Sequence, residues 1–374
     1  MVRGITCLGM MVAMLFSVVA EAQKGHFYVG GSTRDLPAGA GVELWSVDME
    51  SGAMEKIGNP SAVSSPGYLT MNADGSRVYS TNNIPGQQGG FISTFSVDPI
   101  SNQLTKMQTQ QTDASSASYI RLDGTGKWMM SANYGRGNIV VNPVLNDGTL
   151  GATSATIKHE GKSIHQRRQQ GSHAHCIVSG PENKFVFVPD LGIDKIVAYG
   201  FDDSTGALTA VPEMDIVTPP GSGPRHIIFH PNGKLAFATI EMTGHLGTYT
   251  YEDGKLSPVG LYPATPASYV GAQSTSEVRV SPNGRFVYVG NRGHDSIAVF
   301  KINRKTGKAK LIQNISTEGS WPRNFGITSC GKMMVVGNQK SNTIVSFRIN
   351  PFTGKLSSTG QQAHTNGPSY ILFK

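Results

Sequence analysis

The chain of 374 residues carries 45 glycines and 20 prolines, and only 15% of its residues are charged. This composition is typical of a protein built mostly from turns and buried strands. The net charge of +7 favours anionic partners in general, but the basic residues are scattered apart from 165–168, which argues against nucleic-acid binding. No run of roughly 18 apolar residues follows the first 25 residues, so no membrane span is predicted.

Residues 1–22 have the pattern of a secretory signal peptide. A positively charged start precedes an apolar stretch over 5–20, and the small residues Ala20 and Ala22 offer a cleavage site. A buried first strand is the alternative, but the stretch lacks the alternation of apolar and polar residues that a strand shows. We therefore expect an exported protein, periplasmic or secreted, whose mature chain 23–374 forms a single domain.

The mature sequence repeats one two-part signature seven times. The first part is a turn before a short apolar run, and its leading residues are Tyr68, Tyr119, His175, His226, Val278, Phe325 and Tyr370. The second part is a strand-like run closed by a polar or glycine turn, found at 43–52, 91–102, 139–148, 196–206, 246–254, 297–307 and 344–354. A period of about 50 residues is typical of a β-propeller, in which each repeat is one four-stranded blade. The sequence therefore predicts an all-β, seven-bladed β-propeller.

Each predicted blade contains four antiparallel strands, which we call A to D from the axis outward. The last repeat, which begins at Gly367, provides only an A strand before the chain stops. Three strand-like runs without an A strand stand at the other end of the mature chain, at 26–31, 43–48 and 54–59. We expect these four strands to form one blade, because closing the ring removes the free sheet edges that an open ring would leave.

Two cysteines remain in the mature chain, Cys176 and Cys330. Both fall in segments predicted as inner strands of different blades, so we expect two buried free thiols and no disulfide. Their spacing does not resemble that of a zinc site either.

The connectivity of the strands within the blades also locates a candidate site. Because neighbouring strands are antiparallel, the start of each A strand and the end of each B strand lie at the same mouth of the central channel. Polar and charged residues are frequent at the A-strand starts 173–175, 224–226, 276–277 and 322–324. They are equally frequent at the B-strand ends 82–83, 133–134, 190, 241, 291–292 and 338–339.

Arginines, imidazoles and carboxylates around one funnel suit a small, oxygen-rich anion. Guanidinium groups bind carboxylate or phosphate through two hydrogen bonds and can stabilise a developing oxyanion. His173 or His175 could act as a general base on water, and Glu241 or Glu277 could orient that histidine or serve as the base. Each residue alone could equally hold loops together, but their convergence from four blades favours a site.

Other chemistries have weaker support in the sequence. His173, His175, Asp190 and Glu241 offer donors for a divalent metal ion, but the neighbouring arginines would repel a cation. No G-x-S-x-G nucleophile elbow and no phosphate-binding P-loop occurs. We therefore expect a site that uses neither a metal nor a cofactor.

Several stretches resemble the seven-bladed β-propeller lactonases, a family that includes the propeller-type 6-phosphogluconolactonase and the fungal carboxy-cis,cis-muconate cyclising enzyme. The stretches that carry the resemblance are 168–176, 188–196, 223–234, 276–300 and 322–327. The resemblance implies a metal-independent propeller that opens or forms lactones. It places the family's site on an H-A-H histidine, the arginine of G-P-R-H, a glutamate after the next B strand and the arginine of N-R-G. These are His173 or His175, Arg225, Glu241 and Arg292, and Glu277 matches a further recurrent glutamate.

The leading hypothesis is a lactone hydrolase, similar to 6-phosphogluconolactonase, that opens a sugar-acid or related anionic lactone with an activated water. The candidate catalytic residues are His175, His173, Glu241, Arg225 and Arg292. The candidate substrate-binding residues are Glu277, Arg323, Asp190, His226 and Asn291. Two alternatives stay open, a muconate-type cycloisomerase and a non-catalytic propeller that binds a sugar acid or a protein. We expect a monomer.

Overall fold

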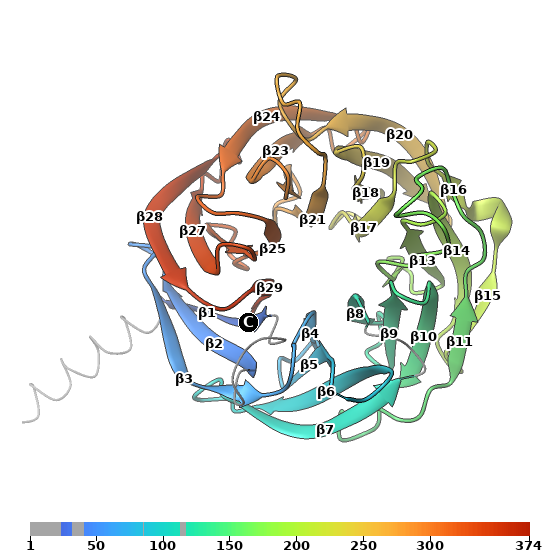
Figure 1. The fold of residues 1–374 in the computed structure, drawn as a ribbon, viewed down its shortest axis with the longest axis horizontal. Helices are drawn as coiled ribbons and strands as arrows, with labels where there is room; N and C mark the ends of the chain where they lie inside the picture. The colour runs from blue at the N-terminus through green and yellow to red at the C-terminus, as the bar shows by residue number, and fades with distance from the viewer. Residues whose placement is uncertain (1–23, 32–40, 85, 113–116) are drawn as a thin grey trace, which may run out of the picture.

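The computed structural model describes residues 24–31, 41–84, 86–112 and 117–374, so the predicted signal peptide lies outside the described residues. The strands form seven antiparallel sheets, which are arranged as blades around a central channel (Figure 1). The predicted seven-bladed β-propeller is confirmed. Within the described part of the chain, no helix has the length and hydropathy needed to cross a bilayer.

Every blade contributes one strand to each of four concentric layers. The inner strands, around the channel, are β4 (Leu69–Met71), β8 (Tyr119–Leu122), β12 (Val178–Ser179), β17 (Pro224–Phe229), β21 (Thr275–Val280), β25 (Pro322–Ile327) and β29 (Pro368–Phe373). The second strands are β5 (Arg77–Asn82), β9 (Trp128–Asn133), β13 (Phe185–Asp190), β18 (Leu235–Ile240), β22 (Phe286–Asn291), β26 (Met333–Asn338) and β1 (Lys24–Gly31).

The two outer layers complete the blades. The third strands are β6 (Gly90–Val97), β10 (Asn138–Pro143), β14 (Lys195–Asp202), β19 (His245–Glu252), β23 (Ser296–Ile302), β27 (Thr343–Ile349) and β2 (Gly41–Asp48). The outermost strands are β7 (Leu104–Thr112), β11 (Ala155–Lys158), β15 (Ala207–Ala210), β20 (Lys255–Pro263), β24 (Ala309–Ser316), β28 (Leu356–His364) and β3 (Met54–Ala62). A short additional strand, β16 (Ile216–Val217), follows the 3-10 turn η1 (Pro212–Met214) and pairs with β14.

The blade that closes the ring joins the two ends of the chain. The C-terminal strand β29 pairs with β1, with Val29 opposite Ile371 and Tyr28 opposite Leu372. β1 then pairs with β2, and β2 with β3. The red C-terminal strand consequently lies beside the blue N-terminal strands in Figure 1. This is the closure that the unequal ends of the sequence predicted.

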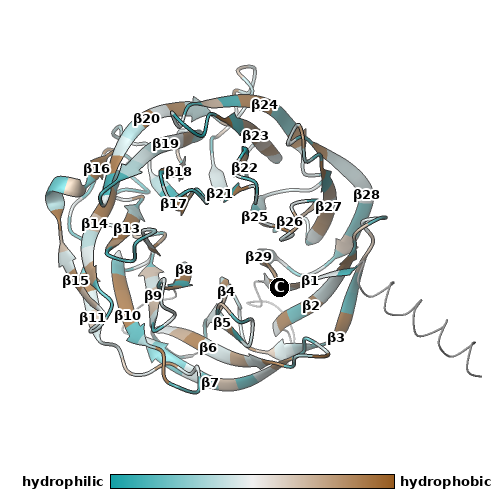
Figure 2. Ribbon diagram, turned by 180° about the vertical axis from the view of Figure 1, so that it is seen from behind, coloured by the Kyte–Doolittle hydropathy of each residue, from teal (hydrophilic) through white to brown (hydrophobic). Residues whose placement is uncertain are grey.

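The core lies between the blades. Middle strands such as β18 are buried along their whole length, because each blade is covered on both faces by its two neighbours. Outermost strands such as β28 are mostly exposed. Hydrophobic residues therefore occur in blades all around the ring (Figure 2).

The two cysteines have different environments. Cys176 is buried, and burial raises the pKa of its thiol to about 12. Cys330 is exposed. Both are free, as predicted, but the expected burial of Cys330 is wrong. The inner strand β25 ends at Ile327, so Cys330 lies in the hairpin turn that follows it.

Candidate active site

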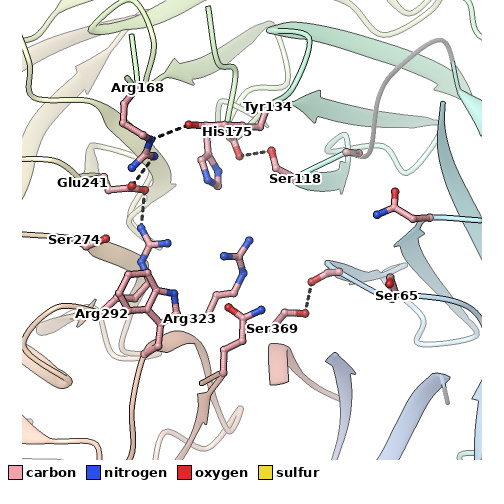
Figure 3. Close-up of a pocket in the computed structure, with 15 residues that line it drawn as sticks. Ser65, Ser118, Tyr134, Arg168, His175, Glu241, Ser274, Arg292, Arg323 and Ser369 are labelled. Carbon is pink, nitrogen blue, oxygen red and sulfur yellow. Dashed lines mark hydrogen bonds and ion pairs between the residues drawn. The ribbon is translucent and has the colours of Figure 1, made fainter. Parts of the chain in front are cut away.

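A cavity of about 450 Å³ opens at the mouth of the channel where the inner strands begin and the second strands end. Its lining residues are Ser65, Gly67, Asn83, Ala117, Ser118, Tyr134, Arg168, His175, Glu241, Ser274, Arg292, Trp321, Arg323, Gln339 and Ser369. Among these residues there are three guanidinium groups and one carboxylate, and Figure 3 shows Arg168 and Arg292 next to Glu241, with Arg323 separate from them. The excess of positive charge suits an anion or a group that becomes negative during a reaction.

The inner strands that supply charged residues begin irregularly. β17, β21 and β25 each shift register against the second strand of their blade, between Pro224 and Ile227, Thr275 and Val278, and Pro322 and Asn324. Such a bulge interrupts the alternation of side chains between the two faces of a sheet. Two consecutive residues can therefore contact each other, as Arg225 Nη1 and His226 Nε2 do at 3.1 Å.

Glu241, directly after β18, is the centre of a charge network. Its Oε2 lies 2.7 Å from Arg292 Nη2 and 3.1 Å from Arg225 Nε, and its Oε1 accepts a hydrogen bond of 2.9 Å from Arg168 Nη2. Burial alone would raise the pKa of Glu241, but Arg292, Arg225 and Arg168 together lower it to about 2. Glu241 is thus a stable carboxylate that fixes three arginines, and it is a weak proton acceptor.

The structure separates the two histidines of the H-A-H motif. His175 lines the cavity, whereas His173 Nδ1 lies 2.8 Å from the carbonyl oxygen of Tyr134 and its ring stacks on the Tyr134 ring at 4.4 Å. The sequence left open which of the two histidines faces the channel. In the structure the inner strand β12 is short, and the backbone N–H of His173 donates to Asp190 Oδ1 at 2.6 Å.

His175 is a neutral imidazole surrounded by positive charge. Burial first, then Arg225, His226 and Arg323, hold the pKa of His175 well below its usual value of 6.5. Its Nδ1 is buried without a hydrogen-bond partner among the described residues, which leaves Nε2 to act toward the cavity. Figure 3 shows the ring pointing inward. The geometry and protonation state both suit a proton acceptor.

Arg323, at the start of β25, has a guanidinium group that is unpaired among the described residues. It forms no hydrogen bond or ion pair with any other described residue, although it lines the cavity beside Arg292. Burial and the charge of Arg292 lower the pKa of Arg323 to about 10, so the group is still cationic at neutral pH. A free guanidinium in a half-closed cavity can bind an anionic oxygen of a ligand through two hydrogen bonds.

Arg225, His226 and Glu277 are buried and are not among the residues that line the cavity. Arg225 donates to the carbonyl oxygen of Ser276. His226 Nδ1 lies 3.4 Å from Glu277 Oε2, which also accepts a hydrogen bond from Asn324. Burial and Arg225 lower the pKa of His226 to about 4, so this ring is neutral at pH 7. These residues support the cavity rather than line it.

Asp190 and Asn291 hold loops and are not among the residues that line the cavity. Asp190 Oδ2 lies 2.8 Å from His159 Nδ1, and its Oδ1 accepts the backbone N–H of Gly192 at 2.9 Å. Asn291 Nδ2 donates to the carbonyl oxygen of Ala264 at 2.7 Å. Internal contacts engage the Asp190 carboxylate and Asn291 Nδ2, and neither residue is placed to contact a ligand in the cavity.

The four residues considered as metal ligands do not converge. Glu241 is bound by arginines, Asp190 by His159 and backbone N–H groups, and His173 by Tyr134. Over the described residues, no group of three or more His, Cys, Asp or Glu side chains is placed to hold a metal ion.

Two prominent cavity residues, Arg168 and Trp321, were not among the candidates from the sequence, whereas Tyr134 was expected at this mouth as part of the B-strand end 133–134. Arg168 Nε donates to the Tyr134 hydroxyl at 3.1 Å, and the Arg292 guanidinium lies 5.4 Å from the centre of the Trp321 ring. Arg168 and Trp321 come from loops that precede inner strands, so strand register could not locate them. Two signals in the sequence included Arg168, namely the basic run 165–168 and the stretch 168–176 that resembles the lactonase family.

Comparisons with known proteins identify the family. Residues 26–373 match the family described as "Lactonase, 7-bladed beta-propeller". The chain is 34% identical over 300 residues to a 6-phosphogluconolactonase of Bacillus subtilis, covering 80% of this chain and 83% of that protein. It is 30% identical over 344 residues to a 6-phosphogluconolactonase of Formosa agariphila, covering 91% of this chain and 97% of that protein.

Solved structures agree with this result. The periplasmic gluconolactonase of Pseudomonas aeruginosa superposes with a TM-score of 0.87 at 30% identity, covering 94% of this chain and 99% of that chain. The predicted relationship and the predicted lactone hydrolase are both confirmed. The chain belongs to the family of seven-bladed β-propeller lactonases.

Proposed function

We propose that this lactonase opens the lactone of a sugar acid, that Arg323 and Arg292 bind the carbonyl oxygen, and that His175 activates the attacking water. The observation that carries the proposal is the free guanidinium of Arg323 in a positively charged cavity that His175 also lines. The names of the relatives, 6-phosphogluconolactonase and gluconolactonase, support a lactone of a gluconate-type acid as the substrate.

Hydrolysis adds one water across the ring ester. His175 accepts a proton from water while the water oxygen attacks the carbonyl carbon, and negative charge develops on the carbonyl oxygen. Arg323 and Arg292 stabilise this oxyanion. The bond between the carbonyl carbon and the ring oxygen then breaks, and the ring oxygen takes the proton from His175. The product is an open hydroxy acid, which ionises to its carboxylate.

Electrostatics favours His175 over Glu241 as the proton acceptor. Glu241 already binds three arginines, whose charges lower its pKa to about 2. The pKa of His175 is low partly because Arg323 is close and positively charged. An oxyanion bound to Arg323 offsets that charge, so the proton affinity of His175 rises as the transition state forms. Glu241 is then a positioning residue for the arginines.

The substitution Arg323→Ala tests the proposal directly. We expect kcat/KM for glucono-lactones to fall about 10²–10³-fold, because the oxyanion loses a charged hydrogen-bond donor. The measurement is the rate of proton release during ring opening, corrected for spontaneous hydrolysis. Arg167→Ala is the matched control, since Arg167 is an exposed arginine outside the cavity lining.

Three results would contradict this assignment. Wild-type rates in the Arg323→Ala protein would remove Arg323 from the mechanism. Saturable binding of sugar acids without turnover by the wild-type protein would instead favour a binding propeller, and loss of muconate absorbance would favour a cycloisomerase.

The pH dependence tests the role of His175. A general base works in its unprotonated form, so activity falls as the pH drops through its pKa. Because that pKa lies well below 6.5, we expect kcat/KM to stay constant from pH 8 down past pH 6.5. Arg323→Ala removes one of the positive charges that lower it, so the acidic limb should move to higher pH. An acidic limb near pH 6.5 in the wild type that does not move in the variant would exclude His175 as the base.

We also propose that the protein is exported by residues 1–22. The signal-like pattern of these residues supports this, and so does the description of the Pseudomonas aeruginosa neighbour as periplasmic. Export would place the enzyme outside the cytoplasm, where the unphosphorylated lactone is the expected substrate. We expect the N-terminal residue of the protein isolated from its native cells to lie close to Gln23. An intact Met1 would contradict export by cleavage.

A further inference from the structure

A second cavity of about 360 Å³ opens at the opposite mouth of the channel. Its walls include residues from the far halves of inner strands, namely Arg121 and Leu122 of β8, Arg279 of β21 and Leu372 of β29. All inner strands begin at the catalytic mouth, so their later residues lie toward the other face of the disc. The second cavity is therefore separate from the site already described.

Three tyrosines separate the two cavities. The ring of Tyr68 lies 4.3 Å from that of Tyr119 and 4.0 Å from that of Tyr370, and all three line the second cavity. Met71 and Leu122 add apolar surface beside them. A flat, apolar body can therefore stack within this cavity on aromatic faces and edges.

Two arginines give the second cavity its positive charge. Arg121 is exposed and forms no ion pair with a carboxylate of the described residues; its main electrostatic partner is the Tyr119 hydroxyl. Arg279 Nη2 donates to the Tyr370 hydroxyl at 2.8 Å. The pairing of two guanidinium groups with an aromatic floor suits a carboxylate attached to a planar group.

Two nearby carboxylates offset part of this positive charge, but neither forms a close ion pair with Arg121 or Arg279. Asp123 lines the same cavity, but its Oδ1 accepts the backbone N–H of Trp128 at 2.9 Å and its Oδ2 accepts Asn183 Nδ2 at 2.9 Å. Glu277, behind the wall, reaches Arg279 only at 3.7 Å and is shared with His226. Hydrogen bonds from neutral donors thus hold the Asp123 carboxylate within its own turn and away from the arginines, and Glu277 offsets the charge of Arg279 in part.

A continuous chain of polar contacts runs from this cavity to the catalytic one. Arg279 Nε lies 3.7 Å from Glu277 Oε1, and Glu277 Oε2 lies 3.4 Å from His226 Nδ1. His226 Nε2 lies 3.1 Å from Arg225 Nη1, and Arg225 Nε lies 3.1 Å from Glu241 Oε2. A ligand that neutralises Arg279 would weaken its attraction for Glu277, and the buried groups that follow offer an electrostatic route to Glu241 with little solvent screening.

We propose that the second cavity binds a small planar organic carboxylate, and that this binding is coupled to the catalytic cavity through the chain from Arg279 to Glu241. The carboxylate pairs with Arg121 and Arg279, and the planar body lies against Tyr68, Tyr119 and Tyr370. The binding stands independently of the proposed function, whereas the coupling rests on it.

The test uses benzoate as the probe and the full-length folded protein. We expect calorimetry to show one benzoate per chain and a crystal soak to place it in the second cavity. Arg121→Ala should weaken binding about tenfold or more, because a charged hydrogen bond is lost. Arg304→Ala, an exposed arginine elsewhere, and Arg323→Ala should bind benzoate like the wild type.

Specific results would overturn the second site or its coupling to the catalytic cavity. Wild-type benzoate affinity in Arg121→Ala, or loss of binding in Arg323→Ala alone, would overturn the second site.

For the coupling, kcat/KM of the wild type should change on saturation with benzoate, whereas Arg121→Ala should keep its basal activity and lose this response. Hydrolysis that saturating benzoate leaves unchanged would overturn the coupling. If the wild type opens no lactone, the proposed function fails and calorimetry still decides the second site.

Discussion

Removing residues 367–374 should prevent the chain from forming a stable monomer. The deletion removes β29, the inner strand of the closing blade, and exposes the edge of β1. It also removes Tyr370 and Ile371, whose exposed fractions are 4% and 1%. Burial of each such side chain stabilises a protein by about 1.5–3 kcal/mol, and the lost strand pairing adds to this. A total loss of roughly 5–10 kcal/mol is of the same order as the whole stability of a typical protein.

Urea denaturation followed by circular dichroism, together with size-exclusion chromatography, measures this effect. Deletion of the exposed Lys374 alone is the control, and it should change the free energy of unfolding by about 1 kcal/mol or less. A monomeric truncated protein that unfolds cooperatively at the wild-type midpoint would show that the ring does not need its C-terminal strand.

Replacing Glu241 by alanine should cost both stability and activity. The side chains of Arg225 and Arg292 are 2% and 7% exposed, and the substitution leaves their charges buried beside each other without a counter-charge. Breaking a buried ion pair by removing one partner costs about 3–5 kcal/mol. The arginines then lose their positions, so kcat/KM for lactones should fall by about 10³-fold or more.

The isosteric variant Glu241→Gln separates charge from shape. The pKa of Glu241 is lowered from 4.5 to about 2, so its stabilisation is fully present above pH 4.5 and is lost as the pH falls toward 2. The difference in unfolding free energy between wild type and Glu241→Gln, about 3 kcal/mol at neutral pH, should therefore shrink across that window. Glu252→Gln, at an exposed carboxylate, is the matched control. A difference that does not depend on pH would contradict the charge network.

The sequence alone determined the architecture and the face that carries the candidate site. A repeat of about 50 residues counts the blades, and antiparallel pairing dictates that A-strand starts and B-strand ends meet at one mouth. Arg225, Glu241 and Arg292 were therefore predicted to lie at one mouth of the channel, and the structure places them within ion-pair distance. The unequal ends of the chain predicted the closing blade in the same way.

Only the tertiary structure decided which side chains face the cavity. Bulges at the starts of β17, β21 and β25 break the alternation on which a strand pattern depends. His173 turns to Tyr134 and His175 to the cavity because contacts with residues 39 and 17 positions away hold the motif. Arg168 and Trp321 reach the cavity on loops, whose paths follow no period. Repetition fixes where strands begin and end, whereas side-chain direction depends on contacts between residues distant in the sequence.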